Sequence, residues 1–240
     1  MKILAIDSSG LVASVAVVED GVLIAEYTMN YKKTHSQTLL PMLEEVKKAI
    51  SLDLSSIDAI AVAAGPGSFT GLRIGSATAK GLGLALDKPL IGVPTVDALA
   101  ANLYDTGEDT LICPIIDARR QQVYTGMYRF ANHNLETVKQ QEALPIGELL
   151  EELNERGKTV IFLGDGVPVY KEMIHEQCKV PYSFAPAHLN RQRAGAVASL
   201  AETYYLEGKT ETAAEHKPNY LRMSQAERER AARLEGEQKN

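Results

Sequence analysis

Short apolar runs bounded by turn residues alternate along the first half of the chain with longer segments in which apolar residues recur every three or four positions. The short runs predict strands, and the longer segments predict amphipathic helices. The elements expected in this half are strands at 2–7, 11–18, 22–28, 57–64 and 89–93, and helices at 36–50, 70–86 and 95–104. Their β-β-β-α-β-α-β-α order is typical of an α/β lobe with a mixed sheet.

The second half repeats the beginning of this plan after a polar, turn-rich stretch at 106–109. We expect strands at 111–116, 123–130, 135–144 and 159–163, and helices at 145–156, 168–177 and 191–207. The pattern divides the chain into an N-terminal lobe at 1–106, a C-terminal lobe at 107–189, a closing helix and return segment at 190–217, and a charged tail at 218–240. Charges alternate in the tail at 227–230, which predicts an exposed or frayed helix.

Composition narrows the class of protein. The chain has 240 residues, of which 45% are hydrophobic and 23% charged, as in ordinary globular proteins. Its formal net charge of −6 argues against non-specific attachment of the whole surface to nucleic acid or to a membrane. It has two cysteines, no uninterrupted apolar run of about 18 residues, and no room for a signal peptide before the first strand. We therefore expect a cytoplasmic protein.

The glycine-rich stretch at 65–75, GPGSFTGLRIG, lies between a predicted strand and a predicted helix. A strand–turn–helix junction of this kind often binds an anion or permits close packing. Neither common phosphate-loop motif matches. A P-loop requires glycine where this chain has Thr70. The dinucleotide fingerprint is G-x-G-x-x-G, and the spacing of Gly65, Gly67 and Gly71 is one residue too long for it. Ser68 or Thr70 is expected to cap the helix.

Small residues recur every four positions in that helix and therefore form one row along one face. Each interior glycine costs about 1 kcal/mol relative to alanine, so the row indicates that something approaches the helix closely. Two interpretations remain open: packing against this chain's own sheet or neighbouring helix, or contact with another chain. The candidate partner interface comprises Leu39, Leu43, Gly71, Arg73, Gly75, Ala79 and Gly83.

Few residues offer catalytic chemistry. The five histidines are scattered and no H-E-x-x-H or C-x-x-C motif occurs, so no metal site is expected. Ser68 is not in a G-x-S-x-G elbow and Cys113 lies in an apolar strand, which favours a cap and a core residue.

Two turns carry candidate polar groups. A candidate phosphate loop comprises Asp7, Ser8, Ser9 and Gly10 at the end of the first strand. The sequence alone favours a structural turn, in which Asp7 accepts hydrogen bonds from nearby backbone N–H groups. The turn at 117–120, Asp-Ala-Arg-Arg, is either a solvated turn or a basic pair that faces the other lobe or a partner.

The order of elements resembles the two-lobed actin-like ATPase (ribonuclease H-like) fold, with duplicated β-β-β-α-β-α lobes. In that fold the turn at 7–10 would be the first phosphate hairpin, here degenerate. The stretches at 65–75, 117–124 and 218–222 resemble the TsaB family, a bacterial subunit of the machinery that forms N6-threonylcarbamoyladenosine at position 37 of tRNA. The resemblance covers nearly the whole chain.

This resemblance implies a non-catalytic role. The related catalytic subunit, a glycoprotease-like metalloprotein, transfers a threonylcarbamoyl group to tRNAs reading ANN codons and carries two metal-binding histidines on its N-lobe helix. The helix at 36–50 here is preceded by His35 and has no second histidine. We therefore expect a scaffold without cofactor, metal or peptidase activity.

The partners that the resemblance implies are the catalytic transferase subunit of the same fold, a small ATPase, tRNA through the complex, and a second copy of this chain when it is alone. A different class of function stays open, namely a nucleotide-binding enzyme (an ATPase or small-molecule kinase) that uses Asp7 and the loop at 164–166.

Overall fold

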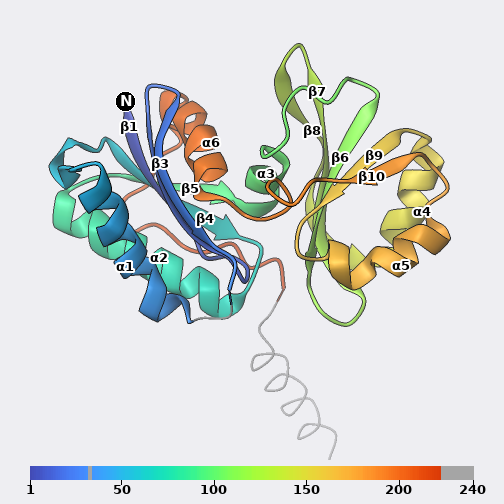
Figure 1. Cartoon of the computed structure of the whole chain (residues 1–240), viewed down its shortest axis with the longest axis horizontal. Coiled ribbons are helices and arrows are strands. Elements are labelled where there is room, and N and C mark those ends of the chain that lie inside the picture. The colour runs from blue at the N-terminus through green and yellow to red at the C-terminus, as the bar shows by residue number, and fades with distance from the viewer. Residues whose placement is uncertain (32–33, 223–240) are drawn as a thin grey trace, which may run out of the picture.

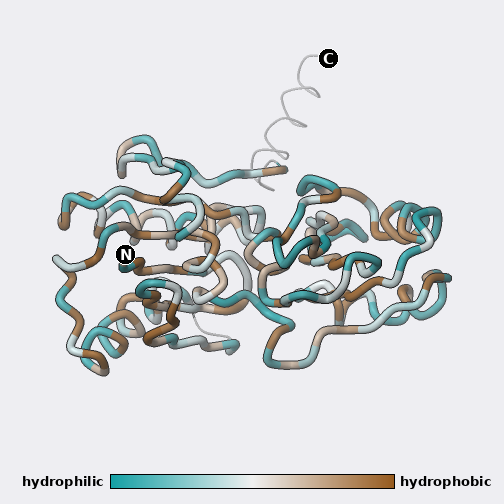
Figure 2. The backbone as a smooth tube through the Cα atoms, turned by 90° about the horizontal axis from the view of Figure 1, so that it is seen from above, coloured by the Kyte–Doolittle hydropathy of each residue, from teal (hydrophilic) through white to brown (hydrophobic). Residues whose placement is uncertain are grey.

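The computed structural model describes residues 1–31 and 34–222, which form two lobes lying side by side (Figure 1). The helix predicted in the charged tail lies outside these residues. Viewed from above, the two lobes again lie side by side, and hydrophilic and hydrophobic segments alternate along the chain in both (Figure 2). Within the described part of the chain, no helix combines the length and apolar character needed to cross a bilayer.

The first lobe is a mixed sheet of five strands in the order β3-β2-β1-β4-β5. β1 runs antiparallel to β2 and parallel to β4, so β1 lies in the middle of the sheet and every one of its apolar residues is buried. The elements are β1 (Lys2–Asp7), β2 (Ala13–Glu19), β3 (Val22–Met29), α1 (His35–Ala49), a 3₁₀ turn (Leu54–Ser56), β4 (Ala59–Gly65), α2 (Phe69–Leu86), β5 (Leu90–Pro94) and α3 (Thr95–Ala100).

The second lobe repeats this arrangement, because its five strands have the order β8-β7-β6-β9-β10. Each strand occupies the place of its counterpart in the first sheet, with β6 in the position of β1. The elements are β6 (Thr110–Asp117), β7 (Gln122–Ala131), β8 (Asn134–Pro145), α4 (Ile146–Arg156), β9 (Thr159–Leu163), α5 (Val167–Gln177) and β10 (Tyr182–Phe184). Two such lobes make the actin-like ATPase fold, so the fold prediction is confirmed.

Helices cover both faces of the first sheet. α1 and α2 pack on one face, while α6 (Ala194–Leu206) returns from the second lobe to cover the other. The inward side of α6 is made of small residues, with Ala194, Ala198 and Ala201 fully buried, which lets the helix axis lie close to the strands.

The structure has one strand that the sequence did not predict and one helix that is shorter than predicted. β10 was not predicted, because three residues are too short a run to show a period. α3 ends at Ala100 rather than at residue 104, and the Asn102 side chain beyond it donates to the carbonyl oxygens of Leu189 and Arg191. That pair of long-range bonds outweighs the local helical pattern.

The row of small residues on α2 faces this chain's own first lobe. A Cβ atom added to Gly71 would lie 2.0 Å from the Ser8 carbonyl oxygen, and one on Gly75 would lie 2.5 Å from Ser8 Oγ. At Gly83 the added atom would lie 2.4 Å from Leu90 Cδ1, and Ala79 is fully buried. The row therefore permits packing within the chain, the first of the two interpretations.

Most residues of the predicted interface are buried within this chain. Besides the row, Leu39 and Leu43 are also buried in the core under α1, with 1% and 6% of their surface exposed. These side chains cannot contact another chain while they pack on the sheet. Arg73 is the one member of the predicted set that is exposed to solvent.

Candidate functional site

A cleft of about 770 Å³ lies between the two lobes. Its first-lobe wall is formed by the turn after β1, His35 at the start of α1, and the N-terminal turn of α2. Its second-lobe wall is formed by the turn after β6, Asp165 and Val169, and Arg222 from the C-terminal segment also lines it. The turn at 7–10, which the resemblance led us to expect as a degenerate phosphate hairpin, lies at this cleft, so the polar groups of the cleft decide what chemistry it can support.

The turn after β1 is held by hydrogen bonds between its own residues. Asp7 Oδ1 accepts hydrogen bonds from the Ser9 backbone N–H (2.9 Å) and from the Ser9 hydroxyl (2.7 Å), and the first of these is the kind of bond expected of a structural turn. Asp7 Oδ2 has no partner among the described residues, and burial raises the pKa of this carboxyl to about 6. Of the four predicted loop residues, Ser9 and Gly10 line the cleft, whereas Asp7 and Ser8 lie behind it.

The start of α2 packs directly against that turn. Ser8 Oγ donates to the Gly71 carbonyl oxygen (2.9 Å), and the Ser68 N–H donates to the Ser9 carbonyl oxygen (2.6 Å). A Cβ atom at Gly67 would lie only 2.2 Å from that same Ser9 oxygen, so glycine is required for the approach. The Gly71 N–H is capped by Ser68 Oγ at 3.3 Å, as predicted for Ser68. The N–H groups of Ser68 and Gly71 are therefore bonded within the protein and not free for an anion at the helix start.

The second-lobe wall carries carboxylates that protein donors also satisfy. Asp117 Oδ1 accepts from the Arg119 N–H (2.9 Å) and from the Tyr170 hydroxyl (2.9 Å). Asp165 Oδ1 accepts from the Asp117 N–H (3.0 Å), and burial raises the pKa of Asp165. The Arg119 guanidinium pairs with Asp117 at 3.2 Å. Among the described residues, both signs of charge thus lie on this wall.

No metal centre is assembled in the described residues, where no group of three or more His, Cys, Asp or Glu side chains is placed to hold an ion. His35 lies at the cleft, and its Nε2–H donates to the Gly10 carbonyl oxygen (2.8 Å).

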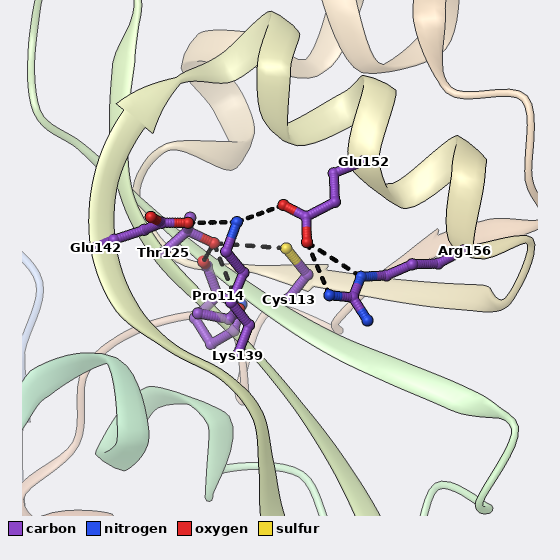
Figure 3. Close-up of polar contacts among 8 residues, drawn as sticks. Cys113, Pro114, Thr125, Lys139, Glu142, Glu152 and Arg156 are labelled. Carbon is purple, nitrogen blue, oxygen red and sulfur yellow. Dashed lines mark hydrogen bonds and ion pairs between the residues drawn. The ribbon is translucent and has the colours of Figure 1, made fainter.

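A polar cluster on the second lobe is structural. Lys139 bonds to both Glu142 and Glu152, and Arg156 pairs with Glu152 at 2.8 Å (Figure 3). The Cys113 thiol beneath them is fully buried, and burial raises its pKa to about 12, so it stays protonated and unreactive. The prediction that Cys113 is a core residue is confirmed.

Sequence reasoning missed the role of residues 219–222, which we call the C-terminal strap. The Asn219 N–H donates to the Ala64 carbonyl oxygen at the end of β4 (2.6 Å), and Arg222 donates to the Ala118 carbonyl oxygen on the second lobe (2.6 Å). Between these anchors, the Tyr220 ring stacks on Phe69, with centroids 4.4 Å apart. The strap therefore crosses from one lobe to the other beside the start of α2.

The outward side of α1 and α2 is a second candidate surface. Opposite the buried row, α2 presents an exposed row that starts at Arg73 and continues with small residues, namely Ala77, Gly81 and Ala85. A Cβ atom at Gly81 would meet nothing within 4 Å. Leu84 of α2 and Leu40 of α1 are 72% and 54% exposed. This side offers apolar contacts and little steric hindrance.

The duplicated lobes and the family match define the class of protein. A family model described as TsaD, tRNA N6-adenosine threonylcarbamoyltransferase, matches residues 22–230. Proteins named tRNA threonylcarbamoyladenosine biosynthesis protein TsaB from several bacteria are similar to this chain. The Bacillus subtilis protein is 36% identical over 95% of this chain and 96% of its own length, and the Escherichia coli protein is 30% identical over 92% and 95%. The chain belongs to the TsaB family, which is named for the biosynthesis of threonylcarbamoyladenosine in tRNA.

Solved structures agree with this assignment. The structure of YeaZ from Pseudomonas aeruginosa matches with a TM-score of 0.78 and 28% identity, over 92% of this chain and 99% of that one. A second Pseudomonas aeruginosa structure, of an uncharacterized protein with similarity to peptidase YeaZ, has a TM-score of 0.79 and 28% identity, with coverage of 92% and 99%.

Proposed function

We propose that this protein is a non-catalytic scaffold that binds and supports the catalytic threonylcarbamoyltransferase subunit, so that the complex forms N6-threonylcarbamoyladenosine at position 37 of tRNAs reading ANN codons. A small ATPase joins this complex. The chain reaches tRNA indirectly, through the complex, and the complex acts in the cytoplasm. The observation that carries the proposal is the outward surface of α1 and α2, with its small-residue row and exposed leucines.

This surface suits a partner of the same fold. A partner with two helices in the same position could lay them across α1 and α2, and the absence of side-chain bulk at Gly81 would let the helix axes approach closely. Burial of Leu40 and Leu84 would then supply apolar stabilisation that these side chains lack in the free chain. The same surface allows pairing of two copies of this chain when the partner is absent.

The cleft supports the non-catalytic part of the proposal. The N–H groups of Ser9, Ser68 and Gly71 are bonded within the protein, the carboxylates on the second lobe have protein donors, and the described residues hold no metal-ligand cluster. The alternative, a nucleotide-binding enzyme, would need free donors for the phosphates at this place. Calorimetric titration with ATP and magnesium separates the two classes, and saturable binding accompanied by hydrolysis would favour the enzyme.

The experiment that tests the scaffold is a titration of this chain with the purified transferase subunit of the same organism, followed by tRNA modification with the reconstituted complex. Gly81→Arg should weaken the binding of that subunit at least about tenfold, because a long charged side chain would block the helix contact. Gly147→Arg is the matched control, since this helical glycine on the second lobe also has open space around its Cα. If both variants bind the transferase subunit equally well, the outward surface of α1 and α2 is not its binding site.

A further inference from the structure

Arg73 stands at the N-terminal end of the exposed row on α2 and is held in place by two aromatic rings. Its guanidinium carbon lies 5.8 Å from the centroid of Phe69 and 6.0 Å from that of Tyr220. Its Nε–H donates to the Tyr220 hydroxyl at 3.3 Å. The two rings are parallel to within 2° and stacked on each other, and we call this stack, beside which the guanidinium lies, the platform. A side chain that would otherwise be mobile is therefore restrained.

The platform depends on the strap. Tyr220 follows Asn219, which is bonded to the first lobe, and precedes Arg222, which is bonded to the second. Leu221 between them packs against the apolar cluster that joins α3 to the second sheet. The position of Tyr220, and with it that of Arg73, is consequently set by residues of both lobes.

Arg73 lacks an acidic partner in residues 1–31 and 34–222. Arg129, Arg156 and Arg193 each pair with a glutamate, whereas no carboxylate of the described residues lies within ion-pair distance of Arg73. Its terminal nitrogens likewise make no hydrogen bond to this part of the chain. A restrained guanidinium with free donors is suited to a carboxylate, which it can bind through two parallel hydrogen bonds.

We propose that Arg73 receives a carboxylate of the transferase subunit, and that the strap, through Tyr220, presents Arg73 for this contact. The inference rests on the proposed function and adds to it the chemistry of one partner group. A protein carboxylate is favoured over an RNA phosphate because the guanidinium continues a row of small residues that suits a helix, and because the chain carries a net charge of −6.

The test measures the affinity of the transferase subunit for Arg73→Ala, Tyr220→Ala and the double variant, together with the thermal unfolding of each free chain. Arg73→Ala should weaken binding about tenfold to a hundredfold. Tyr220→Ala should have a similar effect, and the double variant should bind little worse than either single one, because both changes remove the same contact. Arg129→Ala, an exposed arginine of the second lobe, should bind like the unaltered chain.

The outcomes separate this inference from the proposed function. If the unaltered chain does not bind the transferase subunit, both are wrong. If it binds and Arg73→Ala binds equally well, only the carboxylate contact is wrong. A Tyr220→Ala protein that melts at a lower temperature but binds normally would restrict the strap to a structural role. If Arg73→Ala binds the transferase subunit with unchanged affinity but its complex no longer retains tRNA, Arg73 contacts RNA, and the proposed contact with a carboxylate is wrong.

A charge reversal identifies the acidic group. Arg73→Glu should bind more weakly than Arg73→Ala, because it places two negative charges together. Replacing the matching carboxylate of the transferase by lysine should then restore binding to Arg73→Glu. Each exposed acidic residue on the facing helices of the transferase can be replaced by lysine in turn. If none of these replacements restores binding to Arg73→Glu, the proposal is contradicted.

Discussion

Asp7 shows how burial changes a residue that the sequence places in a phosphate loop. Both of its oxygens are shielded from water, one bonded twice to Ser9 and the other unpaired, and burial raises its pKa from an ordinary 3.8 to about 6. Between these two values the folded chain binds more protons than the unfolded chain does. Its contribution to stability therefore falls as pH rises through this range and is lowest above about pH 6.

Asp7→Asn removes that penalty while it keeps an oxygen that can accept from Ser9. We expect the variant to exceed the unaltered chain in free energy of unfolding by up to ~3 kcal/mol at about pH 7.5, and by almost nothing at about pH 4. Denaturant unfolding of both proteins across this pH range measures the difference in free energy of unfolding. Because all other groups titrate in both proteins, their contributions cancel in this difference. A difference that does not change with pH would contradict the burial effect.

Helix α2 carries two rows of small residues with the same spacing, and this explains why the sequence could not tell which row is buried in the first lobe. One row, which includes Gly75, faces the sheet, and the other, which includes Gly81, faces solvent. A period of four residues reveals that both faces of the helix carry small side chains, but it does not reveal which face packs against the sheet. The burial of Gly71 is decided by the Ser8 carbonyl oxygen, 63 residues away in the chain.

Alanine substitutions distinguish the two rows. Gly71→Ala should lower the free energy of unfolding by about 1–3 kcal/mol or more, because its Cβ would lie 2.0 Å from a backbone oxygen that cannot move freely. Gly81→Ala should raise it by about 0.5–1 kcal/mol, because the site is open and alanine favours the helix. Chemical denaturation of both variants measures the signs, and two variants with the same sign would contradict the orientation of α2.

Elements with a strong local pattern were the ones that could be predicted. Apolar runs and periods gave the helices and all strands except β10, together with the duplicated plan, because these depend on residues close together in the sequence. The strap has no such pattern. Its partners, Ala64 and Ala118, are far away in the chain and contribute only backbone oxygens, which look alike at every position.

At the scale of the whole molecule, the two lobes share part of their core. Val96 and Leu99 of α3 belong to the same buried cluster as Ile112 and Tyr124 of the second sheet. α6 adds a second connection, since the chain leaves the second lobe to cover the first sheet. The lobes that the sequence divides near residue 106 are therefore expected to unfold together, as a single cooperative unit.

Tyr128 and Asp97 test this coupling. The Tyr128 hydroxyl on β7 donates to Asp97 Oδ1 on α3 at 2.6 Å, so the bond joins the lobes, and Tyr128 is almost fully buried. Tyr128→Phe should cost about 1–3 kcal/mol, because it removes a donor from the partly buried Asp97 carboxylate. Scanning calorimetry should show one transition in both proteins, at a lower temperature in the variant. Tyr104→Phe is the control, since Tyr104 is 72% exposed. Two separate transitions, or equal effects of the two substitutions, would show that the shared cluster does not couple the lobes.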